Sequence, residues 1–351
     1  MTTSLELARA AYREVSLYTV ESDPCALDLS DNTNLWGSPP AARRALSELA
    51  DGGFARYPSA YASELKDALA RYAGVGASCI ATGCGSDDIL DSAIRAFAEP
   101  GDRIAFCAPT FAMIPIFARL NGVEPVAVPM TAAWDIDSDA LAGTGGRVIY
   151  VCSPNNPTGT IASRGAIERL IARASGVVIL DEAYAEFAGT SCLDLAMAND
   201  RVLVVRTLSK AFGLAGLRVG YAVGAPALVA EVEKSRGPYK VSTVAERAAV
   251  AALEHDQGWI ADRVVDARES RERLAESLRA LGLTPLPSRA NFVLVPVANA
   301  PVVATCMRAR GVAVRAFQGL PLVGDALRIT AGPAPTMDQA LVALEDVLRC
   351  T

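Results

Sequence analysis

Six short runs of apolar residues, separated by amphipathic or turn-rich stretches, dominate the middle of the chain. Each run is continuously apolar, which is typical of strands buried on both faces rather than of strands with one face in water. Such runs predict an α/β fold with a mostly parallel central sheet and helices on both faces. The runs are Arg103–Cys107, Val123–Val128, Val148–Cys152, Val177–Leu180, Val202–Val205 and Val219–Val223.

A different pattern begins near Lys240. Val241–Leu253 predicts a helix, and a long charged helix follows from Asp262 to about Leu281. Beyond it, the apolar segments ANFVLVPV, GVAVRAF and ALRITAG alternate with helical patterns. At 351 residues the chain is long enough for two domains. We therefore expect an N-terminal arm over 1–35, a large domain over 36–245 and a smaller α+β domain over 246–351.

Composition argues against several classes of protein. The net charge of −6 argues against a nucleic-acid partner. The single histidine, His255, and eight cysteines without CxxC spacing argue against a zinc site and a histidine-dependent hydrolase, and we expect no metal. The sequence lacks a secretory signal and any apolar run of the ~20 residues needed to span a bilayer. We expect a soluble cytoplasmic protein with reduced thiols.

The segment Thr207–Tyr221, TLSKAFGLAGLRVGY, offers a candidate nucleophile. Lys210 lies in an apolar, small-residue setting, where loss of hydration favours the neutral amine that attacks an aldehyde. Thr207, Ser209 and Arg218 carry hydroxyls and a guanidinium that suit a phosphate dianion. Taken alone, the segment is equally compatible with a surface lysine beside a glycine-rich turn.

The segment Val177–Phe187 ends a predicted buried strand in a carboxylate, Asp181. A buried carboxylate needs a partner, and the protonated nitrogen of a pyridine ring would serve. Tyr184 follows three residues later and could reach the phenolic oxygen of the same ring. The alternative is an aspartate that caps a turn or helix.

Three further sites follow other runs. Asn156 precedes Pro157, which favours extended backbone, and its amide could donate to a phenolate. Gly85 and Ser86 precede an amphipathic helix whose first N–H groups could bind phosphate. Phe111 could stack on an aromatic ring. Each has an ordinary alternative: a polar turn, a common strand–helix connection and a core aromatic.

The order of these motifs along nearly the whole chain resembles the class I and II aminotransferases, which have fold type I and bind pyridoxal 5′-phosphate (PLP). Within that class the chain is most similar to the histidinol-phosphate aminotransferase family. The similar segments are LDLSDNTNLWG, RYPSAYASELKDALA, GCGSDD, TLSKAFGLAGLRVGY, RGPYKVS, ANFVLV, GVAVR and LRITAG. The chain departs from that family's pattern at Thr33, Leu35 and Trp36, and at Lys240, where the family has asparagine.

The resemblance implies a role for each candidate residue. Lys210 would hold PLP as a Schiff base, with Asp181 and Tyr184 as further catalytic residues. Arg328 would bind the substrate α-carboxylate, Arg315 the substrate's own phosphate, and Asn156 would also face the substrate. Tyr57 would reach the cofactor phosphate of the partner in a homodimer. The remaining cofactor contacts would be Gly85, Ser86, Phe111, Asn156, Thr207, Ser209 and Arg218.

The resemblance also implies a reaction. Histidinol phosphate would be the amino donor and 2-oxoglutarate the acceptor, giving imidazole acetol phosphate and glutamate. Arg315 and Lys240, which the cofactor leaves without a role, favour a donor with an anionic far end. Two alternatives stay open: a paralogous aminotransferase for another amino acid, and a PLP decarboxylase resembling threonine-phosphate decarboxylase. A cofactor-sensing DNA-binding regulator is disfavoured, because the 35 residues before the fold leave no room for a DNA-binding module.

Overall fold

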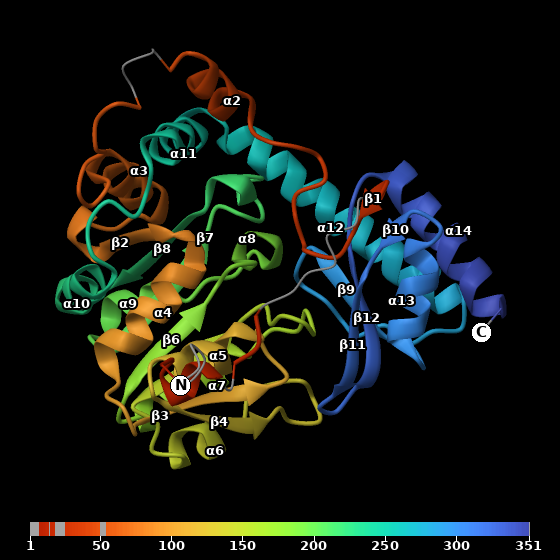
Figure 1. Cartoon of the computed structure of the whole chain (residues 1–351), viewed down its shortest axis with the longest axis horizontal. Coiled ribbons are helices and arrows are strands. Elements are labelled where there is room, and N and C mark those ends of the chain that lie inside the picture. The colour runs from red at the N-terminus through yellow and green to blue at the C-terminus, as the bar shows by residue number, and fades with distance from the viewer. Residues whose placement is uncertain (1–6, 14, 18–24, 50–53, 351) are drawn as a thin grey trace.

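The computed structural model describes residues 7–13, 15–17, 25–49 and 54–350. Its centre is a seven-stranded sheet with the strand order β2-β8-β7-β6-β5-β3-β4 (Figure 1). Strand β8 is antiparallel to its neighbours β2 and β7, whereas the other pairs are parallel. The strands are β2 (Ile80–Cys84), β3 (Arg103–Ala108), β4 (Glu124–Pro129), β5 (Val148–Cys152), β6 (Val177–Asp181), β7 (Val202–Thr207) and β8 (Val219–Gly224).

The six predicted strands and the mostly parallel α/β sheet are confirmed. Strand β2 was not among them, because its second half, Thr82–Cys84, is not an apolar run. Successive residues of a strand enter different clusters, as in Ile104 and Ala105 of β3, so the sheet is buried on both faces. The helices of this part are α2 (Pro40–Ser47), α3 (Ser63–Ala73), α4 (Gly85–Phe97), α5 (Met113–Leu120), α6 (Ser138–Gly143), α7 (Arg164–Arg173), α8 (Ala185–Ala188), α9 (Leu193–Ala198), α10 (Pro226–Arg236) and α11 (Thr243–His255).

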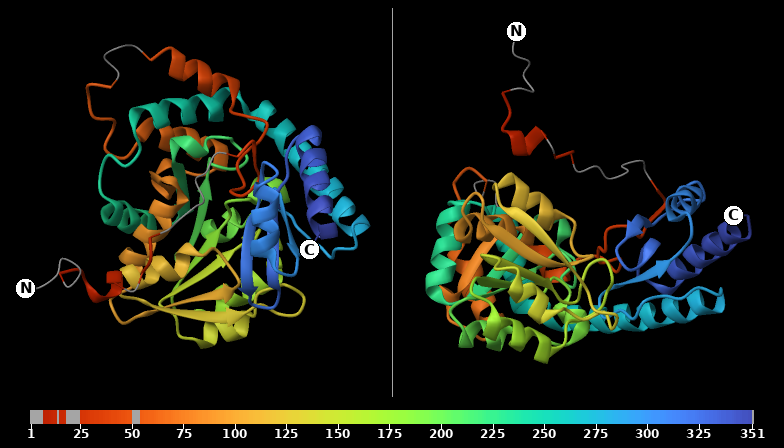
Figure 2. Two further views of the ribbon diagram at one scale, coloured as in Figure 1. Left: turned by 45° about the vertical axis from the view of Figure 1, so that its right-hand side comes forward. Right: turned by 90° about the horizontal axis from the view of Figure 1, so that it is seen from below.

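The C-terminal part contains a three-stranded antiparallel sheet in the order β11-β12-β9. Helix α12 extends to this sheet from α11, and α13 and α14 lie beside it (Figures 1 and 2). An apolar cluster that includes Leu274, Val293 and Leu344 joins α12, β9 and α14. The elements are α12 (Gln257–Ala280), β9 (Phe292–Pro296), α13 (Ala300–Arg308), β11 (Arg315–Leu320), β12 (Gly324–Thr330) and α14 (Ala334–Cys350).

The segment that begins at Cys25 contacts the C-terminal part of the chain. Strand β1 (Leu27–Asp28) pairs in parallel with β10 (Val312–Ala313). A short helix, α1 (Ala10–Arg13), precedes it and contacts α5. The division into 1–35, 36–245 and 246–351 stays a prediction. Of the helices within the described ranges, none combines the length and apolar character needed to cross a bilayer.

The parallel strands place several polar side chains at one edge of the central sheet. Asp181 is the last residue of β6, Thr207 is the last residue of β7, and Asn156 follows β5 by four residues. The carboxyl ends of neighbouring parallel strands meet at one edge, and ligands of open α/β sheets bind outside it. This edge faces the segment after β1 and strands β11 and β12, which complete the cavity described below.

Candidate active site

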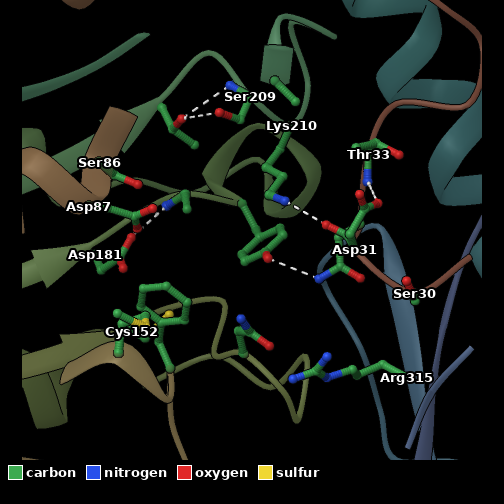
Figure 3. Close-up of a pocket in the computed structure, with 18 of the residues that line it drawn as sticks. Ser30, Asp31, Thr33, Ser86, Asp87, Cys152, Asp181, Ser209, Lys210 and Arg315 are labelled. Atoms are coloured by element: carbon green, nitrogen blue, oxygen red, sulfur yellow. Dashed lines mark hydrogen bonds between the residues drawn. The ribbon is translucent and has the colours of Figure 1, made fainter. Parts of the chain in front are cut away.

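A cavity of about 700 Å³ lies between the carboxyl edge of the central sheet and the C-terminal strands. Figure 3 shows Asp181 and Ser86 on one side of it, Arg315 on the other and Lys210 between them. Among the predicted site residues, Gly85 and Tyr57 do not line the cavity. Those that do are Ser86, Phe111, Asn156, Asp181, Tyr184, Thr207, Ser209, Lys210, Arg218, Arg315 and Arg328.

The Lys210 amine points into the cavity from the turn after β7 (Figure 3). Its Nζ donates to the Asp31 carbonyl at 2.8 Å and lies 5.9 Å from the centre of the Tyr184 ring. Burial, with a further contribution from the positive charge of Arg328, lowers the pKa of Lys210 from 10.5 to about 8. A substantial fraction of the amine is therefore neutral near physiological pH, as a nucleophile or base requires.

The Asp181 carboxylate forms the wall of the cavity at the end of β6 and is 4% exposed. Its Oδ2 accepts from the Tyr150 hydroxyl at 2.7 Å, and its Oδ1 accepts from the Ala183 N–H at 3.0 Å. Burial raises the pKa of Asp181 to about 6, and the hydrogen bond from Tyr150 opposes that rise. A buried carboxylate of this kind gains most from a cationic partner in the cavity.

Tyr184 and Asn156 line the same cavity as Asp181. The Tyr184 hydroxyl accepts from Asn32 Nδ2 at 3.0 Å, and its ring packs edge-on against Phe292, with centroids 5.2 Å apart. Asn156 Oδ1 accepts from Arg328 Nη1 at 2.6 Å. With its oxygen engaged there, the Asn156 amide presents its N–H₂ group as a donor, and the Tyr184 hydroxyl has a hydrogen to donate.

A group of hydrogen-bond donors that suit a phosphate lines the cavity near the backbone of Lys210. We call this group the phosphate cradle. The Thr207 and Ser209 hydroxyls are 2.9 Å apart, and Arg218 Nη1 lies 3.4 Å from Ser209 Oγ. Ser86 and Asp87 of the first turn of α4 line the same cavity, and the first turn of a helix leaves its N–H donors without intrahelical acceptors. Gly85 has φ 80°, and a Cβ on it would lie 2.5 Å from Arg218 Nη2. Glycine is therefore required here for the guanidinium to lie across the helix start.

Two arginines from neighbouring strands line the opposite side. Arg328 of β12 and Arg315 of β11 are paired residues in the antiparallel register. Arg328 is 7% exposed, donates to Asn156 and to the Ser30 carbonyl, and lies over the rings of Phe292 and Phe317. These contacts fix the plane of its guanidinium, which suits recognition of a carboxylate or phosphate.

Tyr57 and Lys240 lie away from the cavity of their own chain. Tyr57 is 84% exposed and packs against the Tyr239 ring, with centroids 4.9 Å apart. Lys240 Nζ forms an ion pair with Asp88 Oδ1 at 3.2 Å. The sequence-based association of Lys240 with the substrate therefore has no support from this cavity.

Several residues that contact the site were not predicted from the sequence. Tyr150 was one residue of an apolar run, and Asn32 was one letter of the LDLSDNTN motif, without a role. Asp87 was also missed: its Oδ2 lies 3.3 Å from Arg218 Nη2, and burial raises its pKa. Asp87 could have been found, because it belongs to the GCGSDD motif. Nothing in the sequence indicated that Tyr150 contacts Asp181.

An amine with a lowered pKa and a buried carboxylate in one cavity, beside hydroxyls and a guanidinium that suit a phosphate, are the groups of an enzyme that acts on carbonyl and amino compounds. The model of the family "Aminotransferase class I and II" matches residues 25–346. The chain belongs to this family of aminotransferases. The enzyme class and the fold expected from the sequence are thereby confirmed.

Individual relatives agree with this assignment. The chain is 41% identical over 303 residues to a histidinol-phosphate aminotransferase of Methylibium petroleiphilum, covering 84% of this chain and 81% of that one. It is 38% identical over 334 residues to the same enzyme of Roseiflexus castenholzii, covering 92% and 89%. The crystal structure of histidinol-phosphate aminotransferase from Sinorhizobium meliloti with pyridoxal-5′-phosphate matches with a TM-score of 0.84 and 26% identity, covering 93% and 92%.

Proposed function

We propose that this protein is a PLP-dependent aminotransferase that transfers the amino group of histidinol phosphate to 2-oxoglutarate, giving imidazole acetol phosphate and glutamate. The relatives at 41% and 38% identity, which carry that enzyme's name, support the choice of reaction. The observation on which the proposal chiefly rests is the convergence of Lys210, Asp181 and Arg328 on one cavity, with Arg315 beside Arg328.

The residues of the cavity fit PLP. Thr207, Ser209, Arg218 and the start of α4 would hold its phosphate, and the space that the absent Cβ of Gly85 leaves for Arg218 supports this. Asp181 would pair with the ring nitrogen, and Asn156 and Tyr184 would donate to the phenolic oxygen. Phe111 lines the same cavity and would stack on the ring.

When bound, PLP supplies an electron sink that stabilises negative charge at the substrate Cα. Lys210 would hold the cofactor covalently through Nζ and, once displaced by the substrate amine, would move the proton at Cα. The pKa of Lys210, about 8, suits both roles near neutral pH. Asp181 would keep the ring nitrogen protonated, because its ionised form favours a cation at that position.

The two arginines would orient both substrates. Glutamate and 2-oxoglutarate carry an α-carboxylate, whereas histidinol phosphate has a phosphorylated CH₂–O group in that place. Arg328, held on Asn156 and the Ser30 carbonyl, would clamp the α-carboxylate. Arg315, the register partner of Arg328, would meet the phosphate of the donor. Two guanidinium groups at one end of the cavity thus suit a pair of substrates that differ in their anionic group.

The proposal includes a homodimer. Tyr57 is exposed in the single chain and packs against Tyr239 at the surface, with its ring tilted relative to the Tyr239 ring. Its hydroxyl would complete the phosphate cradle of the partner subunit. Tyr57→Phe should then weaken PLP binding without altering the cavity of its own chain. Light scattering should give the mass of two chains.

We also propose a cytoplasmic location. All eight cysteines are free thiols, which suits the reducing environment of the cytoplasm.

Spectral titration tests the proposed reaction. Histidinol phosphate should convert the visible absorption of the PLP-loaded protein to that of the amino form of the cofactor, and 2-oxoglutarate should restore it. Faster conversion by another amino acid would instead identify a paralogous aminotransferase. Release of CO₂ from a carboxylated donor, without conversion to the amino form, would identify a decarboxylase.

A further inference from the structure

Asn32 has a backbone conformation that few residues tolerate. It follows β1, is 1% exposed and has φ 60°. Left-handed backbone is uncommon outside glycine, and asparagine and aspartate are among the few side chains that adopt it readily. Such conformations persist where the surrounding structure fixes them, and they are enriched at functional sites. Asn32 also lines the cavity.

The polar groups of Asn32 connect three parts of the chain that are distant in sequence. Its Nδ2 donates to the Tyr184 hydroxyl at 3.0 Å. Its N–H donates to Thr330 Oγ1 at 3.1 Å, and its Oδ1 lies 3.2 Å from the same hydroxyl. Its carbonyl accepts from Asn291 Nδ2 at 3.1 Å. Tyr184, Thr330 and Asn291 are all buried, so each of these hydrogen bonds is shielded from water.

The contact between Asn32 and Tyr184 has a fixed direction. An amide N–H₂ group can only donate, so the Tyr184 oxygen accepts on that side. The hydroxyl's own hydrogen must then be directed away from Asn32. Tyr184 lines the cavity, and Lys210 Nζ lies 5.9 Å from the centre of its ring. Asn32 thereby makes the hydroxyl available as a hydrogen-bond donor to a ligand.

The Thr330 contact links this arrangement to the residue that would clamp the substrate. Thr330 and Arg328 are two residues apart on β12, so their side chains lie on the same face of that strand. A movement of β12 when a carboxylate binds Arg328 would act on Asn32 through Thr330, and through Asn32 on Tyr184. We propose that Asn32 is a positioning residue that aims the Tyr184 hydroxyl at the phenolic oxygen of the cofactor and couples this orientation to the substrate-binding strand. This inference rests on the proposed function.

Two substitutions at position 32 test the direction of the hydrogen bond. Asn32→Asp preserves the shape and tolerates the left-handed backbone, but a carboxylate accepts, so it would draw the Tyr184 hydrogen away from the cavity. Asn32→Gly also tolerates this backbone and removes the donor without adding charge. Either change weakens donation to the phenolic oxygen. The negative charge on that oxygen is then less stabilised, and the pH at which the cofactor's visible band titrates should rise.

The experiment is a pH titration of the visible absorption of PLP-loaded protein for both variants, each in the wild-type and the Tyr184→Phe background. We expect an upward shift of about one pH unit in the wild-type background, the size of one hydrogen bond. In the Tyr184→Phe background the Asn32→Gly shift should disappear. Asn32→Asp should retain only the part caused by its charge, which the double-mutant comparison separates.

Asn34 provides a matched control within the same segment. Its Nδ2 donates to the Ala211 carbonyl at 3.1 Å, whereas the hydrogen bond to the Tyr184 hydroxyl comes from Asn32. Asn34→Ala should lower the melting temperature without moving the titration. Equal shifts from Asn32→Gly in both backgrounds would overturn the inference and leave the proposed function intact. Absence of a visible PLP band in the wild-type protein would overturn both.

Discussion

The Tyr150 hydroxyl donates to Asp181 Oδ2 at 2.7 Å from the neighbouring strand of the sheet. Both side chains are almost completely buried, with exposed fractions of 1% and 4%. Burial raises the pKa of Asp181 to about 6, and this hydrogen bond counters that effect by stabilising the ionised form. Tyr150 therefore helps to keep a negative charge where the proposed function needs one, opposite the ring nitrogen.

Tyr150→Phe should raise the pKa of Asp181 by about one to two units in the cofactor-free protein. A hydrogen bond to a charged group is worth about 1.5–3 kcal/mol, and one pKa unit corresponds to about 1.4 kcal/mol. A carboxylate with a higher pKa is neutral over a wider acidic range. The pH below which the apoprotein loses affinity for PLP should thus move upward, as measured by PLP titration between pH 5 and 9.

Tyr221→Phe is the matched control, because Tyr221 is as buried as Tyr150 and lies on the same sheet without contacting Asp181. It should leave the acidic limit of PLP affinity in place. Asp181→Asn should abolish that limit and reduce kcat and kcat/KM together, since the charge matters most as the carbanion develops. An unchanged acidic limit in Tyr150→Phe would contradict the assigned role of the hydroxyl.

Incorporation of PLP into the apoprotein should accelerate as the pH rises, with half of its maximal rate near pH 8 and a plateau at higher pH. The reason is the lowered pKa of Lys210, about 8, since only the neutral amine attacks the aldehyde. Stopped-flow absorbance between pH 6 and 10 would measure this. Arg328→Met removes a positive charge that lowers this pKa, so the plateau of this variant should begin at a higher pH.

Borohydride reduction of the PLP-loaded protein should fix the cofactor on Lys210, which peptide mapping would detect. Label on Lys234 or Lys240 would refute the assignment of Lys210.

The sequence predicted the parallel sheet because continuous apolar runs depend only on local composition. The same locality explains what it missed. Tyr150 and Asp181 are 31 residues apart and meet only because β5 and β6 are neighbours in the sheet. Asn32 and Tyr184 are 152 residues apart and meet through the packing of the segment after β1. The order of the strands and the packing of the segment after β1 depend on contacts between distant parts of the chain, and local sequence patterns do not predict such contacts.

The convergence of these strand-end residues on one cavity was predictable for a different reason. Lys210, Asp181 and Asn156 lie at or just beyond strand ends, and parallel strands bring those ends together whatever their order. Lys240 has no such constraint, because it follows α10 on the surface and pairs with Asp88. Motifs at strand ends could therefore be placed in one site, whereas cations on surface loops could not.

Arg206→Met should destabilise the fold by about 3–5 kcal/mol. Arg206 Nε and Nη2 lie 3.0 and 2.7 Å from Glu182 Oε2, and both side chains are less than a tenth exposed. Removing the arginine leaves a buried, unpaired carboxylate directly after Asp181. Arg164→Met is the control: it removes exposed ion pairs with Glu168 and Asp194 and should change stability by less than about 1 kcal/mol per pair. Urea unfolding would compare the two, and equal losses would contradict the argument.

Arg328→Lys should weaken transition-state binding of carboxylated donors, as measured by kcat/KM, by about 2–3 kcal/mol, the scale of a charged hydrogen-bonded pair. The Arg328 guanidinium is held by Asn156 and by the Ser30 carbonyl, and a lysine cannot keep both contacts and a two-point grip on the substrate. Steady-state kinetics with glutamate would measure the loss. Unchanged kcat/KM for every amino donor would assign the clamp to another residue.

Arg315→Ala should raise KM for histidinol phosphate far more than for histidinol. Arg315 lines the cavity from β11 beside Arg328, on the side opposite Ser86 and the cofactor-phosphate cradle (Figure 3). Only the phosphorylated donor loses a charge-assisted contact, worth about 1.5–3 kcal/mol, so its KM should rise about 10- to 100-fold. Comparing both donors on both proteins forms a double-mutant cycle between a side chain and a substrate group. Equal effects on the two donors would mean that the phosphate does not bind at Arg315, and a paralogous aminotransferase with another donor would become the better proposal.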